Sequence, residues 1–168
     1  FWDQINEGLA AAIEYFGNFN CTISPVDMGA EADGRTLSDY IETLMLDEPD
    51  GIVCCPMSDG TEAYVDKAVE AGITVVTYLS ESSNQGDTRI AFSGSDATAG
   101  GQAAAQAIAD FTGGEGTVGI ITGYLTMNQH EERRISMTEK LQELCPNLTI
   151  LEPVEAHDST TETYDAAV

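Results

Sequence analysis

Residues 51–78, GIVCCPMSDGTEAYVDKAVEAGITVVTY, carry the pattern that decides the fold class. Residues 51–55 and 73–78 are short apolar runs, which favour strands buried on both faces of a sheet. Between them, apolar side chains recur at helical spacing as far as Gly72, a residue suited to end a helix. A strand, a helix and a second strand with short connections predict two parallel strands joined by a crossover helix.

The alternation of helices and strands extends in both directions from this unit. We expect further helices over residues 1–16, 37–45, 99–111 and 131–144, and further strands over residues 21–26, 89–92, 117–122 and 148–154. The predicted fold class is therefore α/β, with Rossmann-like parallel sheets flanked by helices. Gly94-Ser95-Asp96 joins two such series, and we interpret it as the boundary between two incomplete lobes, residues 1–95 and 96–168.

Both ends of the sequence indicate a middle piece of a longer α/β protein. The first predicted helix begins at Phe1 without a preceding strand for its apolar stripe to cover. Ser159-Thr160-Thr161-Glu162 is a capping box that starts a helix barely two turns before Val168. We expect the first strand of one lobe and the rest of the other lobe to lie outside this sequence.

The composition excludes several classes of partner. The chain has 29 acidic and 6 basic side chains and a formal net charge of −23. Such a surface repels phosphate backbones and anionic lipid headgroups, so we expect no contact with nucleic acid or membrane lipid. No apolar run is long enough to span a membrane. We interpret the charge as a solvated, solubilising surface.

The sequence also lacks the motifs of common enzymes, such as a GxSxG elbow, a P-loop lysine or HExxH. Residues 114–119 match GxGxxG, but these glycines follow a predicted helix and lead into a strand, the reverse of a dinucleotide site. His130 and His157 have no partner at metal-ligand spacing, and the four cysteines form no CxxC pair and are expected to be buried free thiols. We therefore predict no catalysis, no metal and no cofactor.

Polar residues follow the predicted strands at the edge where open α/β sheets bind ligands. They are Met57, Ser58 and Asp59 after one strand, Leu79, Ser80 and Glu81 after the next, and residues 123–128 in the second series. Each position alone is also explained by turn formation, which Ser, Asp and Asn favour. Their convergence on one edge favours a binding site.

Several stretches resemble the type I periplasmic binding proteins, and most closely the ribose-binding-like sugar receptors of ABC importers. They are Phe1-Trp2, Glu48-Pro49-Asp50-Gly51-Ile52-Val53, residues 68–77, Ser95-Asp96 with Gly100-Gly101, and residues 116–123. The resemblance covers essentially the whole chain. It implies two Rossmann-like lobes joined by three crossovers with a solute between them, and this chain would hold most of one lobe and the start of the second.

The resemblance also implies contacts to a sugar. Phe1 and Trp2 fall where aromatic rings of the family stack on the sugar face, although either ring would also serve as a hydrophobic staple for the helix. Arg133 falls where an arginine clamps sugar hydroxyls, with Arg134 as the alternative, and pairing with a neighbouring glutamate is a rival role. Asn128 precedes this arginine. His157 corresponds to a further aromatic position.

Two departures leave the ligand open. The branch usually places an aspartate after the strand that ends at Tyr78, where this chain has Leu79. Residues 135–137 also replace a glycine and an aromatic that are common in the family. The expected ligand is a sugar, a modified sugar, a nucleoside-like compound or another small polar solute.

The sequence thus predicts an extracytoplasmic solute-binding protein that closes around a small polar ligand and serves a membrane permease of an ABC importer. Its location would be the periplasm or, as a lipoprotein, the cell surface. The candidate ligand-binding residues are Phe1, Trp2, Ser58, Asp59, Leu79, Ser80, Glu81, Asn128, Arg133 and His157. The alternatives are the effector domain of a LacI-type transcriptional regulator and the sensor domain of a membrane signalling receptor.

Overall fold

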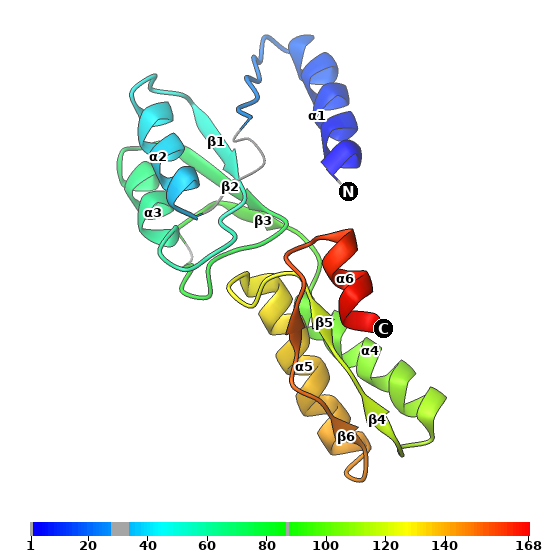
Figure 1. Ribbon diagram of the computed structural model, residues 1–168. Coiled ribbons are helices and arrows are strands. Elements are labelled where there is room, and N and C mark those ends of the chain that lie inside the picture. The colour runs from blue at the N-terminus through cyan, green and yellow to red at the C-terminus, as the bar shows by residue number, and fades with distance from the viewer. Residues whose placement is uncertain (1, 28–33, 87) are drawn as a thin grey trace. The chain divides into compact units, whose positions relative to one another are not determined.

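The computed structural model describes residues 2–27, 34–86 and 88–168 (Figure 1). It divides into two compact units, Phe1–Glu31 and Ala32–Val168, which are described separately. None of the described helices is long and apolar enough to cross a membrane.

The first unit contains one helix, α1 (Trp2–Gly17), as its apolar stripe predicts. The ring of Tyr15 lies 5.1 Å from that of Phe16 and 5.3 Å from that of Phe19, and all three are exposed. The prediction of a strand over residues 21–26 is wrong, because these residues follow α1 without regular structure. A strand needs a neighbour for its backbone N–H and C=O groups, and none of the described strands pairs with this segment.

The second unit begins with a sheet of three parallel strands in the order β1-β2-β3. The strands are β1 (Gly51–Cys54), β2 (Thr74–Tyr78) and β3 (Ala91–Ser93), and the helices are α2 (Gly34–Met45) and α3 (Glu62–Glu70). Ile52, Cys54, Val75 and Thr77 are buried, and the strand register places them on one face of the sheet. Helices α2 and α3 lie beside each other on one side of this sheet (Figure 1). Val53 alternates to the other face and is 70% exposed, so the prediction of burial on both faces is wrong for β1.

The second series of elements contains two pairs of short parallel strands, β4 with β6 and β5 with β7. The elements are α4 (Ala97–Thr112), β4 (Thr117–Val118), β5 (Ile121–Thr122), α5 (Asn128–Leu144), β6 (Thr149–Ile150), β7 (Val154–Glu155) and α6 (Thr160–Ala167). Two continuous strands were expected here, and each is interrupted. Gly119 lies in the first break, and Pro153, which has no N–H to donate, lies in the second.

Helices α4 and α5 pack closely, and this contact positions the start of α5. A Cβ atom on Gly101 of α4 would overlap Ser136 Oγ and the carbonyl oxygen of Arg133 on α5, so only glycine permits this approach. Ala105 and Leu141, one on each helix, are fully buried. Asp96 caps α4 by accepting a hydrogen bond of 2.8 Å from the Ala99 N–H.

The structure is therefore α/β with parallel sheets flanked by helices, as the alternation of elements predicts. The glycines at residues 113–116 connect α4 to β4, which agrees with excluding them as a dinucleotide site. The proposed lobe boundary at residues 95 and 96 falls between β3 and α4 and stays a prediction.

Candidate functional site

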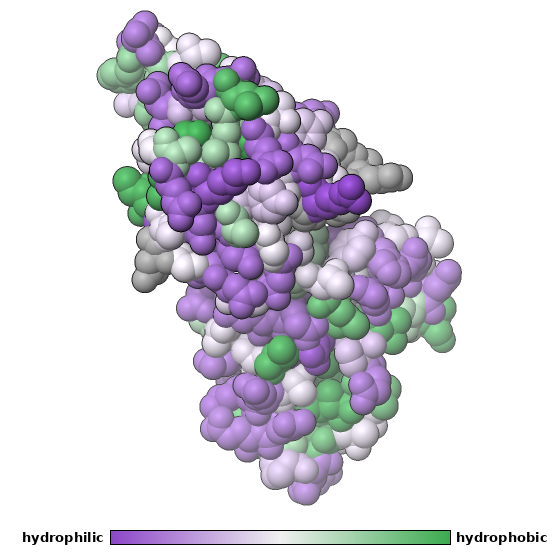
Figure 2. All heavy atoms as spheres, turned by 90° about the vertical axis from the view of Figure 1, so that its left-hand side faces the viewer, coloured by the Kyte–Doolittle hydropathy of each residue, from purple (hydrophilic) through white to green (hydrophobic). Residues whose placement is uncertain are grey.

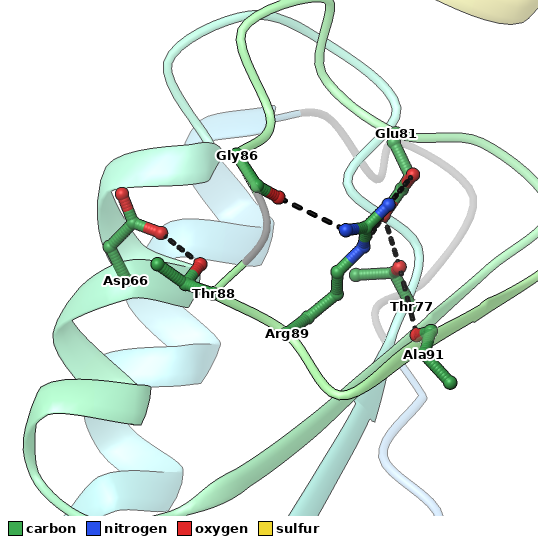
Figure 3. Close-up of polar contacts among 7 residues, drawn as sticks. All are labelled: Asp66, Thr77, Glu81, Gly86, Thr88, Arg89 and Ala91. Atoms are coloured by element: carbon green, nitrogen blue, oxygen red, sulfur yellow. Dashed lines mark hydrogen bonds and ion pairs between the residues drawn. The ribbon is translucent and has the colours of Figure 1, made fainter.

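The loop after β2 is fastened by an ion pair between Arg89 and Glu81 (Figure 3). Arg89 Nε donates to Glu81 Oε1 over 2.8 Å, and Nη2 donates to Oε2 over 2.9 Å. The two side chains are only 20% and 17% exposed. Thr77 Oγ1 also donates to Glu81, and Arg89 Nη1 donates to the Gly86 carbonyl over 3.1 Å. The Glu81 carboxylate, a predicted ligand contact, is thus engaged within its own loop.

The loop after β1 presents Asp59, whose Oδ1 accepts several hydrogen bonds. The Ser83 hydroxyl donates over 2.7 Å, the Ser83 N–H over 3.0 Å and Asn128 Nδ2 over 3.0 Å. The side-chain hydrogen bonds from Ser83 and then Asn128 lower the pKa of Asp59, so its carboxylate is ionised near neutral pH. Asp59 therefore joins the loops after β1 and β2 to the start of α5.

The start of α5 contributes two amide side chains to this cluster. Asn128 Nδ2 donates to the Glu81 carbonyl over 2.9 Å as well as to Asp59, and the Asn128 backbone N–H donates to the Met57 carbonyl over 3.2 Å. Gln129 Nε2 donates to the Leu79 carbonyl over 2.6 Å and to Ser95 Oγ over 3.3 Å. We call Asp59, Leu79, Glu81, Asn128 and Gln129 the strand-end cluster.

Leu79 joins the cluster through its backbone. Its φ of +65° lies in the left-handed region, which residues with a Cβ atom rarely adopt. The Leu79 N–H donates to the Ser93 carbonyl over 2.9 Å, while its own carbonyl accepts from Gln129. Leu79 therefore contributes a backbone turn and a carbonyl group to the cluster.

Two further predicted residues, both serines, lie beside the cluster. Ser58 is half-buried and lines a polar cavity of about 470 Å³ together with Arg35, Asp59 and Tyr64. Ser80 is 6% exposed, and its hydroxyl has no hydrogen-bond partner among the described residues. Its backbone N–H donates to the Tyr78 carbonyl over 2.8 Å.

The expectation of buried free thiols is correct for three of the four cysteines and wrong for Cys21. Cys54, Cys55 and Cys145 are buried, whereas Cys21 is exposed. Burial raises the pKa of Cys54 to about 12 and that of Cys55 to about 11. No group of three or more His, Cys, Asp or Glu that could hold a metal ion occurs among the described residues.

Arg133 and Arg134 have different environments on α5. Arg134 is half-buried and forms an ion pair with Glu131, whereas the Arg133 side chain is exposed. Within residues 2–27, 34–86 and 88–168, no hydrogen bond or ion pair engages the Arg133 guanidinium. Of the two arginines, Arg133 is therefore the one with donors available to a ligand.

His157 lies in the turn between β7 and α6. Its Nδ1 is 2.7 Å from Glu162 Oε2, its Nε2 is 3.6 Å from Glu155 Oε2, and its ring is 5.3 Å from that of Tyr124. The hydrogen bond to Glu162 raises the pKa of His157. No hydrogen bond joins it to the strand-end cluster in the part of the chain that the structure describes. Phe1 and the side chain of Trp2 lie outside that part.

The structure thus brings together four predicted residues, Asp59, Leu79, Glu81 and Asn128, although Leu79 and Glu81 take part through their carbonyl groups. Gln129, Ser83 and Arg89 also make hydrogen bonds in this region, although the sequence did not predict a role for them. A glutamine next to a candidate asparagine at a helix start was the signal available for Gln129. No comparable signal pairs Arg89 with a glutamate eight residues earlier.

Comparison with protein families gives one match over the whole chain. The model of the periplasmic binding protein domain matches residues 1–168. This is a family of binding proteins and not of enzymes. A search of curated proteins found no significant match.

Solved structures give the same fold. GanP, a glucose-galactose binding protein from Geobacillus stearothermophilus, has a TM-score of 0.84 and 21% identity, over 99% of this chain and 57% of GanP. A carbohydrate transporter solute-binding protein from Agrobacterium radiobacter, in complex with D-arabinose, has a TM-score of 0.80 and 24% identity, over 94% of this chain and 54% of that one.

A solute-binding protein of an ABC transporter from Burkholderia graminis, also with D-arabinose, has a TM-score of 0.73 and 26% identity, over 80% of this chain and 46% of that one. The chain therefore spans about half the length of these proteins. The predicted type I periplasmic-binding-protein fold is confirmed, and the chain corresponds to about half of it.

Proposed function

Because the chain belongs to the family of periplasmic binding protein domains, we propose that the whole protein captures a small polar solute, a sugar or sugar-like compound, for ABC-type import. The observation that carries the proposal is the meeting of Asp59 and Asn128, from opposite sides of the proposed lobe boundary, at the carboxyl ends of β1 and β2. Open α/β sheets bind ligands at this edge.

The chemistry of the cluster suits a polyhydroxylated ligand. An ionised carboxylate such as Asp59 accepts hydrogen bonds from hydroxyl groups, and a free guanidinium such as Arg133 donates to hydroxyl oxygens in a fixed geometry. Ser58 and Ser80 would add hydroxyl groups, and His157 would contribute from the second series. Phe1 and Trp2 remain proposed stacking residues for the sugar face.

Asn128 would contact the ligand in one particular way. Its Nδ2 carries two hydrogens, and Asp59 and the Glu81 carbonyl accept from that nitrogen. The side-chain oxygen is therefore the part of Asn128 left for a ligand. A hydroxyl or N–H donor of the solute would meet this acceptor.

The proposal includes a place and a partner. A protein of this kind works outside the cytoplasm, in the periplasm or anchored at the cell surface, and delivers its solute to a membrane permease. Binding would close the lobes, residues 1–95 and 96–168, around the ligand, and closure would be stabilised by contacts from both sides.

The test is thermal unfolding of the full-length protein against a panel of sugars, nucleosides and amino acids. A ligand present at about a hundred times its dissociation constant stabilises the folded protein by about 2.7 kcal/mol, which raises the Tm by several degrees. We expect a selective rise with one or a few sugars. A rise only with nucleosides or amino acids would contradict the sugar assignment, and no rise with any compound would contradict the proposed function.

A further inference from the structure

Asn128 and Gln129 make their hydrogen bonds across the proposed lobe boundary. All the acceptors belong to residues that precede α4: the Asp59 carboxylate, the Leu79 and Glu81 carbonyls and the Ser95 hydroxyl. The backbone N–H of Asn128 reaches the same side through Met57. These contacts join protein groups directly, so none of them needs a ligand atom between its donor and its acceptor.

Resting on the function proposed above, we propose that Asn128 and Gln129 form a ligand-independent clamp that holds the two lobes closed. Gln129 raises the affinity for the solute without touching it. The Gln129 side-chain amide donates to the Leu79 carbonyl and to Ser95 Oγ. Ser95 lies in the segment that joins the two proposed lobes. The clamp thus reaches the segment about which the lobes would move.

The acceptors in the loops after β1 and β2 are held in place by contacts other than those of the clamp. Asp59 is fixed by both the N–H and the hydroxyl of Ser83. The loop that carries the Glu81 carbonyl is fixed by the Arg89–Glu81 ion pair (Figure 3), and the left-handed backbone of Leu79 directs its carbonyl. Groups that are already ordered lose less conformational entropy when they pair.

The donors are also held in place. Asn128 and Gln129 are the first residues of α5, and α5 packs against α4 at Gly101, where no side chain separates the two helices. The Asn128 N–H donates to the Met57 carbonyl, so the first turn of α5 is fixed by backbone as well as side-chain hydrogen bonds. A clamp made of rigid parts has few alternative arrangements.

The clamp affects the binding affinity by changing the fractions of open and closed protein. A contact present in the closed protein with and without ligand increases the closed fraction of the ligand-free protein. The apparent dissociation constant is the intrinsic one divided by the fraction of protein that is competent to bind. Removal of the clamp should therefore expand the ligand-free protein and weaken its affinity together.

The test needs no ligand. Small-angle X-ray scattering of the ligand-free full-length protein compares the wild type with Gln129→Ala, with Asn128→Ala/Gln129→Ala and with Gln106→Ala. Gln106 is a matched control, because its Nε2 donates to Asp110 Oδ1 over 2.8 Å within α4, away from the clamp. We expect a larger radius of gyration in the double variant, a smaller change in the same direction in Gln129→Ala, and none in Gln106→Ala.

A second variant tests the clamp by charge. Asn128→Asp keeps the size of the side chain but places a carboxylate against Asp59, so it too should expand the ligand-free protein at neutral pH relative to the wild type. Far-UV circular dichroism verifies that each variant is folded. Scattering profiles of the double variant and Asn128→Asp that superpose on the wild-type profile would overturn the clamp. This result is independent of the ligand panel, so the two proposals fail separately.

Discussion

Arg89 is the residue on which the loop after β2 depends. Its guanidinium pairs with both oxygens of Glu81 and also bonds the Gly86 carbonyl, and the pair is mostly shielded from water (Figure 3). Lys67 and Glu42 form a contrasting pair, whose side chains are 56% and 46% exposed. Exposed pairs contribute little to stability, whereas breaking a buried pair leaves a charge without a partner.

We predict that Arg89→Ala lowers the free energy of unfolding by about 1–3 kcal/mol, because Glu81 then remains half-buried and unpaired. Lys67→Ala should lower it by less than about 0.5 kcal/mol. Urea unfolding followed by circular dichroism measures both. Equal effects of the two substitutions would show that the loop does not depend on the Arg89 pair.

At the scale of elements, the contact between α4 and α5 contains two neighbouring glycines with different surroundings. A Cβ atom on Gly101 would overlap Ser136 and the Arg133 backbone, whereas one on Gly100 would lie 3.8 Å from Arg133 Nε, an ordinary contact distance. The two glycines are therefore a matched pair for testing how closely these helices pack.

We predict that Gly101→Ala destabilises the protein by about 1–3 kcal/mol through overpacking. Gly100→Ala should be neutral or stabilising by up to about 1 kcal/mol, since alanine favours a helix more than glycine does. The midpoints of urea unfolding give both values. A Gly101→Ala protein as stable as Gly100→Ala would contradict the close approach of the helices.

The sequence predicts the helices better than the strands, because the spacing of apolar residues along a helix is a local property of the chain. The strand at residues 21–26 could not be judged in this way, since a strand exists only where another strand pairs with it. Gly119 and Pro153 are residues that disfavour a continuous strand, and both predicted strands break where they lie. The rule that ligands bind at strand ends identified Asp59 and Asn128, whereas the role of Gln129 depends on which loop meets the start of α5.

At the scale of the whole molecule, acidic charge dominates. The chain carries 29 acidic and 6 basic side chains, and hydrophilic residues spread over much of the face in Figure 2, between separate hydrophobic patches. Four of the basic residues, Lys67, Arg89, Arg134 and Lys140, already pair with glutamates. Most of the negative charge is thus balanced by solvent ions alone, and like charges repel within the folded chain.

We predict that the Tm rises as NaCl is increased from about 0.01 M to about 1 M, because the screening length falls from about 30 Å to about 3 Å and repulsion weakens. Differential scanning calorimetry at constant pH measures the rise in Tm, and the same series in KCl is the control for a specific effect of the cation. A screening effect should be similar for both salts. A Tm that does not change with salt would contradict a destabilising role of the net charge.

Burial of the thiols beside β1 has a consequence for chemical labelling. The thiolate is the form of cysteine that reacts with alkylating agents and oxidants. With pKa values of about 12 and about 11, Cys54 and Cys55 are almost entirely protonated near neutral pH, and both residues are buried. They become available to a reagent only when the β1-β2-β3 sheet opens. The rate at which a thiol reagent labels Cys54 and Cys55 therefore reports how often this sheet opens.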